Sequence, residues 1–284
     1  MTGLAATASL PEIAAQLTDP LRVLDVGARW GAADAWVALG DQVRVVGFDP
    51  DPEECARLNA LDTSGRVRYV PLALGPSHTT AKLHVTQEPA CSSLYPPDPA
   101  WYEREALAVM RPASEVDVEL VDLDSWLAGE DAAGIGRFDF AKLDTQGSEL
   151  GVLEGATAAL ASMRALEIEV ELNPLYEGQP LFGDVDRFLR ARGFVLWRLG
   201  QLVHYDLPGV ETSFGRGELA VYNDHTVTHS GGTGQLTWAH AWFVAADWAR
   251  PHPGPIDPQQ ALRDACVAHV LGFPDLAAAA LGRS

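Results

Sequence analysis

Two aspartates bracket a short glycine-containing turn near the start of the chain. Asp25 closes an apolar run that begins at Leu21, Gly27 and Gly31 follow it, and Asp49 ends a second apolar run. Glycine lets the backbone turn tightly and lets a ligand approach with no Cβ in the way. Free N–H groups at the start of a helix attract electron-rich groups, and a carboxylate ending the second strand can accept both ribose hydroxyls. The spacing therefore predicts a nucleoside site.

The glycine spacing indicates which nucleoside fits. Dinucleotide folds carry G-x-G-x-x-G, whose close glycine pair admits a pyrophosphate. Here Arg29 stands between the two glycines, and Asp25 would repel a diphosphate but could hold an ammonium. A ligand with a ribose, an amino group and no phosphate fits better, which points to S-adenosylmethionine. A tight strand–helix turn without a ligand is the plainer alternative.

The other expected cofactor contacts lie at the ends of the same strands. Residues 67–74 form a third strand, whose end lies near the base in a nucleotide fold. The predicted cofactor site consists of Asp25, Gly27, Ala28, Gly31, Asp49, Pro50 and Leu74, with S-adenosylhomocysteine as the product that leaves it.

A third acid follows the fourth expected strand, residues 138–145. Asp144 falls at the carboxyl end of that strand, at the mouth of the cleft, and we interpret it as functional. Lys142 shares its strand face but lies deeper, where an unpaired ammonium would be costly. We therefore expect Lys142 to form a structural ion pair with Asp25 or Glu169.

Candidate acceptor contacts come from three places. The fifth strand, residues 165–172, carries three glutamates on one face, and buried glutamates need water, partners or a site. An insertion over residues 75–138 lies above the strand ends, and the alternation of apolar and polar residues predicts strands over residues 79–86 and 116–121 within it. Ser92, Ser93 and Tyr95 of the insertion either belong to ordinary turns or line the acceptor pocket; both interpretations stay open. The predicted acceptor-binding residues are Ser92, Ser93, Gln146, Glu149, Glu171 and Tyr176.

Strands that alternate with helices predict an α/β fold, a doubly wound sheet of about seven strands with an antiparallel last strand. The sixth strand is expected at residues 194–199 and the seventh at 218–222, joined by a hairpin-like stretch that holds His204. Helices are expected at residues 9–18, 52–61, 150–160 and 184–192.

The composition changes after residue 222. Trp238, Trp242 and Trp248 suggest an amphipathic helix over residues 236–249, and further helices are expected within 262–271 and 276–281. We therefore divide the chain into a cofactor-binding domain, residues 1–225, and a helical C-terminal appendage, residues 226–284. The appendage packs either on the sheet domain or on a second copy of the chain as a homodimer.

The composition limits the classes of protein to which this chain can belong. The chain has 284 residues, of which 47% are hydrophobic and 21% charged, so a sizeable core is expected. The formal net charge of −19 disfavours nucleic acid or an anionic membrane surface as partner. Three scattered cysteines, no basic leader and no apolar stretch of bilayer length fit a cytoplasmic protein without membrane insertion.

Four segments resemble one family. DVGARWG, GFDPD, KLDTQGSELGVLEGA and EVELNPLYEGQPLF, in this order between residues 21 and 199, are similar to FkbM-type S-adenosylmethionine-dependent methyltransferases. The resemblance implies a class I methyltransferase fold and methyl transfer to oxygen on sugars, glycolipids, polysaccharides or secondary metabolites. It places Asp25, Gly27 and Gly31 in the cofactor loop and Asp49 on the ribose. Gln146 departs from the family's K-x-D-x-E-G-x-E segment, where an acid is usual.

These observations give a mechanistic hypothesis, an SN2 methyl transfer to an acceptor hydroxyl. A base must take the hydroxyl proton, and Asp144 is the first candidate, with His204 as the second. No metal site is predicted, because His225 and His229 stand beside a glycine run without the acid of an H-E-x-x-H motif. Two rival functions remain, a non-catalytic interaction module that keeps the fold and an NAD-dependent enzyme.

Overall fold

The computed structural model describes residues 8–207, 218–222, 225–229, 234–250 and 254–283. A seven-stranded sheet in the order β3-β2-β1-β7-β8-β12-β9 forms its centre. The strands of this sheet are β1 (Leu21–Val26), β2 (Val43–Phe48), β3 (Val67–Val70), β7 (Phe140–Leu143), β8 (Ala165–Glu171), β9 (Phe194–Tyr205) and β12 (Gln235–Ala245). β12 runs antiparallel to both its neighbours, and the pairs from β3 to β8 are parallel. The expected doubly wound α/β sheet with an antiparallel last strand is confirmed.

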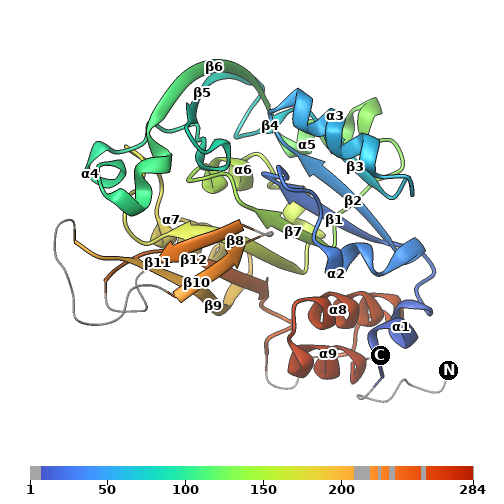
Figure 1. The fold of residues 1–284 in the computed structure, drawn as a ribbon. Helices are drawn as coiled ribbons and strands as arrows, with labels where there is room; N and C mark the ends of the chain where they lie inside the picture. Colours follow the sequence, from blue (N-terminus) through green and yellow to red (C-terminus); the bar gives the residue numbers. More distant parts are fainter. Residues whose placement is uncertain (1–7, 208–217, 223–224, 230–233, 251–253, 284) are drawn as a thin grey trace.

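Helices cover both faces of the sheet (Figure 1). Along β1, Leu24 and Val26 enter one apolar core, whereas Val23 and Leu21 enter the other. The first core packs against α5 (Leu123–Ala128), α6 (Glu149–Glu154) and α7 (Phe182–Arg190). The second packs against α1 (Leu10–Ala14), α2 (Asp34–Val37), α8 (Pro258–Val270) and α9 (Pro274–Leu281).

The insertion builds a second, smaller sheet above the strand ends (Figure 1). It contains β4 (Ala73–Leu74), β6 (Pro112–Val121) and β5 (Thr79–Thr86), in the order β4-β6-β5. α4 (Pro99–Tyr102) and the 3₁₀ turns η2 (Pro89–Cys91) and η3 (Glu105–Met110) lie between β5 and β6 in the chain. The remaining elements are α3 (Pro52–Leu61), η1 (Gly40–Gln42), η4 (Glu130–Ala132), η5 (Ala159–Ala161) and a separate hairpin of β10 (Glu218–Tyr222) and β11 (His225–His229).

Three sequence predictions about strands and helices are wrong. The third strand ends at Val70, since Pro71 has no N–H to donate, and residues 73–74 pair with β6 in the smaller sheet. Residues 218–222 pair with β11 in the hairpin, so they are not the seventh strand of the main sheet. That place belongs to β12, and the helix expected over residues 236–249 is therefore a strand for most of its length.

The C-terminal helices pack on the sheet domain, which confirms one of the two expected arrangements. Arg263 of α8 is 2% exposed and reaches Asp139, the residue before β7, with an Nη1–Oδ2 distance of 2.7 Å. Arg164 binds Asp264 of the same helix at 3.0 Å. The division at residue 225 stays a prediction; β12, on its C-terminal side, belongs to the main sheet.

Candidate active site

A cavity of about 790 Å³ lies where the carboxyl ends of the parallel strands meet the insertion. Open α/β sheets bind ligands at this edge. Strand ends and the turns after them supply Gly27, Asp49, Pro50, Asp144, Gln146, Glu169 and Glu171 to its wall. The insertion supplies β5, β6 and η3 side chains on the other side. The cavity thus brings most of the predicted site together.

Gly27 occupies a turn that no other residue can take. Its φ is +79°, and a Cβ there would lie 1.8 Å from the carbonyl oxygen of Asp144. The N–H groups of Gly27 and Ala28 both donate to the Phe48 carbonyl, at 2.9 and 3.0 Å. These two N–H groups are therefore not available to a ligand. The turn instead brings the ends of β1, β2 and β7 close together.

Two residues of the predicted cofactor loop stand behind the cavity wall. Ala28 is 2% exposed and packs with Cys55, Leu58 and Tyr69. The N–H of Gly31 donates to the Ala28 carbonyl at 2.9 Å. Both residues shape the turn, and the described lining of the cavity contains neither of them.

Asp49 is the predicted ribose acid, and it lines the cavity together with Pro50 and Leu74. Its side chain is 5% exposed, and its Oδ1 accepts the Asp51 N–H at 2.9 Å. Burial raises the pKa of Asp49 to about 6, against the lowering effect of the Asp51 N–H. Arg29 closes this end of the cavity through an ion pair with Asp51 of 3.2 Å. A carboxylate held this way can accept hydrogen bonds from the hydroxyl groups of a ligand.

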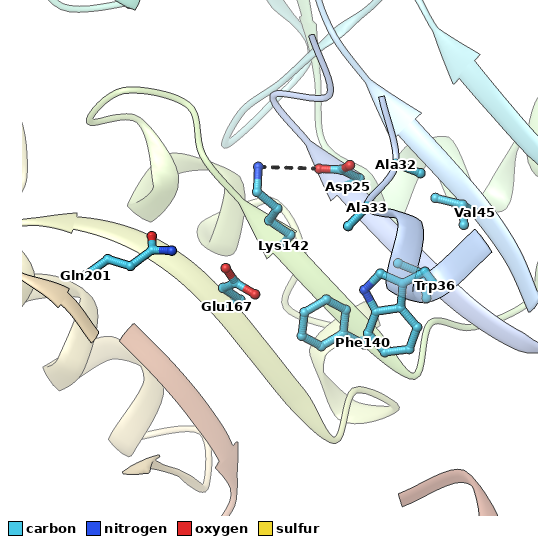
Figure 2. Close-up of a pocket in the computed structure, with 10 residues that line it drawn as sticks. Asp25, Ala32, Ala33, Trp36, Val45, Phe140, Lys142, Glu167 and Gln201 are labelled. Atoms are coloured by element: carbon cyan, nitrogen blue, oxygen red, sulfur yellow. Dashed lines mark ion pairs between the residues drawn. The ribbon is translucent and has the colours of Figure 1, made fainter. Parts of the chain in front are cut away.

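Asp25 lies on a second, smaller cavity of about 210 Å³ (Figure 2). Its Oδ1 stands 3.8 Å from the Lys142 ammonium and has no hydrogen-bond partner within the described part of the chain. Burial raises the pKa of Asp25 to about 6. Trp36 and Phe140, whose ring centres are 4.9 Å apart, line the same cavity. Asp25 thus lines the smaller cavity and not the main one, and Lys142, which lines both cavities, lies between them.

Lys142 holds Asp144 as well as Asp25. Its Nζ lies 3.1 Å from Asp144 Oδ2, which confirms the expected ion pair of Lys142 with an acid of the site. Burial opposes ionisation of Asp144, but Lys142 and then His240 outweigh it and lower the pKa of Asp144 to about 2. Asp144 is therefore an ionised carboxylate in the cavity wall at neutral pH.

Gln146 connects the groups around Asp144. It has a left-handed φ of +56°, and its amide nitrogen donates to Asp144 at 3.1 Å and to Glu169 at 2.5 Å. Its amide oxygen accepts from the Tyr176 hydroxyl at 2.9 Å, and its backbone carbonyl accepts from the Ser93 hydroxyl at 2.6 Å. Gln146, through its side chain and its backbone carbonyl, thus joins the turn after β7, strand β8, the loop after β8 and the insertion.

Three buried glutamates near Gln146 have raised pKa values, in contrast to Asp144. Burial raises the pKa values of Glu169 and Glu171 well above their usual range, and nearby carboxylates add to this effect. Burial also raises the pKa of Glu149 to about 7. Glu149 accepts the Thr145 N–H at 2.6 Å and supports the turn. Glu169 and Glu171 are therefore protonated at neutral pH beside the ionised Asp144.

The predicted acceptor contacts divide into two groups. Ser92, Gln146 and Glu171 line the main cavity, which favours the pocket interpretation for Ser92. Ser93, Glu149 and Tyr176 lie outside its described lining and support it from behind. His204, the second candidate base, is a partly buried residue of β9 that is likewise absent from the described lining of both cavities.

Sequence reasoning missed the apolar side of the cavity. Leu83 and Val85 of β5, Val116 and Val118 of β6, and Leu107 and Met110 of η3 line it, as do Tyr205 and Trp238. The alternation in residues 79–86 and 116–121 predicted strands correctly, but it did not indicate what their apolar faces cover. Glu169, which lines the cavity beside Asp144, was expected only as a partner for Lys142.

Within the described ranges, no group of three or more His, Cys, Asp or Glu side chains is placed to hold a metal ion. His225 and His229 are the two ends of strand β11. No helix in the part of the chain that the structure covers is long and apolar enough to cross a membrane.

A comparison with known protein families shows to which family the chain belongs. Residues 25–196, more than half of the chain, match the family model described as the methyltransferase FkbM domain. The chain belongs to the FkbM methyltransferase family. The match contains the Gly27 turn, Asp49, Asp144, Gln146 and the insertion, so the main cavity of this FkbM domain is built largely by the family segment.

Solved methyltransferases are similar to this FkbM family member at low identity. Methyltransferase FkbM of Methylobacillus flagellatus KT is 15% identical with a TM-score of 0.40, and the match covers 78% of this chain and 44% of that one. This chain thus spans less than half of that protein. Magnesium protoporphyrin IX methyltransferase of Synechocystis, solved with bound S-adenosylmethionine, is 11% identical with a TM-score of 0.37 and coverages of 83% and 77%. A search among curated proteins found no match.

A third similar structure is the 1,6-didemethyltoxoflavin-N1-methyltransferase of Burkholderia thailandensis, solved with its substrate and S-adenosylhomocysteine. It is 16% identical with a TM-score of 0.35, and the match covers 84% of this chain and 78% of that one.

Proposed function

We propose that this protein is an S-adenosylmethionine-dependent O-methyltransferase that acts on a hydroxyl of a small molecule or saccharide. The observation that carries the proposal is the shared cavity of Asp49 and Asp144. A ribose-type acid at the end of β2 and an ionised carboxylate after β7 face one space. The family membership supports methyl transfer as the reaction.

The residues present fit the cofactor. Asp49 is a buried carboxylate at the strand end where ribose hydroxyls are bound in nucleotide folds. Gly27 leaves its side of the cavity without a Cβ, and Pro50 and Leu74 offer apolar surface beside Asp49. When bound, S-adenosylmethionine would supply a sulfonium-activated methyl group for an SN2 displacement.

The protein itself contributes alignment and a proton acceptor. Holding two reactants in attack geometry is worth roughly 7–11 kcal/mol of the barrier. Asp144 takes the hydroxyl proton, because it is the ionised carboxylate of a cluster whose glutamates are held protonated by burial. A carboxylate of low pKa is a weak base, so the proton moves late, once the new O–C bond has made the acceptor oxygen acidic.

The test separates cofactor binding from turnover. Calorimetry should show that the wild-type protein binds S-adenosylmethionine and does not bind NAD. Asp144→Asn should keep this binding and lose turnover, measured as label transfer from methyl-labelled cofactor to a mixture of alcohols and sugars. The matched control Asp117→Asn changes an exposed aspartate of β6 and should retain turnover. Unchanged turnover in Asp144→Asn would remove Asp144 from the mechanism.

We also propose a cytoplasmic location, which three free thiols at Cys55, Cys91 and Cys266 support.

The alternative to a methyltransferase, an interaction module without activity, predicts cofactor binding without methyl transfer to any acceptor. A homodimer through α8 and α9 would use the exposed residues of α9, such as Pro274, Asp275 and Ala279, because residues 261–268 of α8 are all buried within the chain. Light scattering after gel filtration tests that arrangement directly.

A further inference from the structure

The insertion places an aliphatic wall on one side of the main cavity. In the antiparallel pair of β5 and β6, Leu83 stands directly opposite Val116, and both side chains line the cavity. The next pair on this ladder, Lys82 opposite Asp117, is solvent-exposed and forms an ion pair of 3.7 Å. Because alternate residues point to opposite faces of a sheet, one face of this ribbon is apolar and covers the site.

The opposite side of the cavity is polar. Asp144, Gln146 and Glu169 line it at the ends of β7 and β8, tied together by the hydrogen bonds of the Gln146 amide. A ligand that fills both sides must therefore have two unlike ends. Its polar end meets one ionised carboxylate, and its other end meets branched aliphatic side chains.

Two side chains of the apolar wall remain strongly exposed. Val116 is 44% exposed and Val109 of η3 is 47% exposed, and both line the cavity. Exposed apolar surface that gathers on the wall of a cavity marks a place where apolar ligand surface binds. A bare sugar would present hydroxyls to these side chains, and each buried hydroxyl without a partner is unfavourable.

We propose that the methyl acceptor is an alcohol carried on a compact apolar body, and that Leu83 and Val116 select this body against a free sugar. This inference rests on the proposed O-methyltransferase function and narrows its acceptor. The hydroxyl lies at Asp144, which receives its proton as the oxygen gains the methyl group, and the apolar body lies along β5 and β6.

The test measures acceptor binding without turnover. The probes are 4-butylcyclohexanol and methyl α-D-glucopyranoside, titrated calorimetrically into the protein alone and into the protein saturated with S-adenosylhomocysteine. The variant L83N/V116T replaces the two wall residues by polar residues of similar shape. The control K82Q/D117N changes the neighbouring cross-strand pair on the other face of the same ribbon.

We expect the cyclohexanol to bind at least tenfold more tightly than the glucoside. L83N/V116T should weaken cyclohexanol binding about tenfold, because two apolar contacts are lost, and leave S-adenosylhomocysteine binding unchanged. K82Q/D117N should bind both ligands as the wild type does. Equal or tighter binding of the glucoside, or no binding of the cyclohexanol, would overturn the inference. If S-adenosylhomocysteine fails to bind while the cyclohexanol binds in a wall-dependent manner, the proposed function fails and the preference of the wall stands.

Discussion

Gln146→Glu is the change that most directly probes the polar side of the cavity. It replaces a neutral amide, which donates to both Asp144 and Glu169, by an acid that is usual at this place in the family. The new side chain can no longer donate two hydrogen bonds, and when ionised it stands against the ionised Asp144. We expect a loss of folding stability that grows as the pH rises.

The magnitude follows from two competing costs. Two unit charges about 4 Å apart repel by about 4 kcal/mol at an effective dielectric constant of 20. Protonating the new glutamate instead costs about 1.4 kcal/mol for each pH unit above its ordinary pKa of about 4.3. At pH 5 protonation costs about 1 kcal/mol and prevails, whereas at pH 8 it costs about 5 kcal/mol, so the repulsion of about 4 kcal/mol is the smaller penalty. The destabilisation should therefore grow by about 3 kcal/mol between pH 5 and pH 8.

Urea unfolding at pH 5, 6, 7 and 8 measures this difference between variant and wild type. Gln201→Glu is the matched control, because Gln201 also has a left-handed φ, +49°, but its side chain is exposed. The control should change stability by less than about 0.5 kcal/mol at every pH. A Gln146→Glu protein whose destabilisation does not depend on pH would refute the reasoning, since Gln146 would then not lie between two desolvated carboxyl groups.

Three further predictions concern the turn, the ribose acid and the C-terminal helix. Gly27→Ala should lose at least 3 kcal/mol in urea unfolding, since its Cβ would meet the Asp144 carbonyl; Gly178→Ala, with a similar φ of +77° but open space around it, should lose only about 1 kcal/mol. Asp49→Asn should weaken S-adenosylmethionine binding at least tenfold by calorimetry, and wild-type affinity should fall below pH 6 as Asp49 takes up a proton. The pKa of Asp49 in the folded protein, about 6, lies above its value in the unfolded chain, so its contribution to stability is present below pH 4 and is lost as the pH rises through 6. Asp49→Asn should therefore reduce the fall in the stability of the cofactor-free protein between pH 4 and 8 by about 3 kcal/mol. An unchanged dependence of stability on pH would contradict the raised pKa of Asp49. Arg263→Met should cost about 3 kcal/mol, because buried Asp139 loses its close ion pair and keeps only Arg137 at 3.8 Å and the Arg22 N–H at 2.8 Å. Arg187→Met at an exposed ion pair should be nearly neutral, and similar losses for the two variants would contradict the burial argument.

The parallel half of the sheet could be predicted from the sequence because its strands are short continuous apolar runs. β1 and β2 match the expected runs, and each is followed by the acid or glycine that a ligand site needs at that edge. The ion pair of Lys142 followed from its depth on the strand, since a buried ammonium requires a carboxylate. These inferences depend on local pattern and on the geometry common to parallel strands.

The antiparallel half was harder to predict, and β12 shows why. Trp238 and Trp242 are four residues apart, a spacing that places two side chains on one face of a helix and also on one face of a strand. In the structure, Trp242 lies opposite Glu167 and its indole N–H donates to that carboxylate at 3.2 Å. The partner lies 75 positions away in the chain, so no local pattern could reveal it.

Side-chain hydrogen bonds of the candidate site were beyond sequence reasoning for a similar reason. Gln146 was noted as a departure from the family pattern, but its contacts with Glu169, Tyr176 and Ser93 arise only once three loops converge. The aliphatic wall was hidden in the same way. Alternation predicted β5 and β6, whereas the direction of their apolar face depends on how the whole ribbon folds back.

The position of β12 also constrains how the chain reaches its native state. This strand sits between β8 and β9, yet it is made after both of them. A nascent chain emerging from the ribosome can pair β1, β2, β7 and β8 early, but an unfilled gap separates β8 from β9 until residue 245 is available. Pairings this distant in sequence are slow to form. Folding should therefore finish only after translation passes this strand, and until then two open strand edges expose the newborn protein to aggregation.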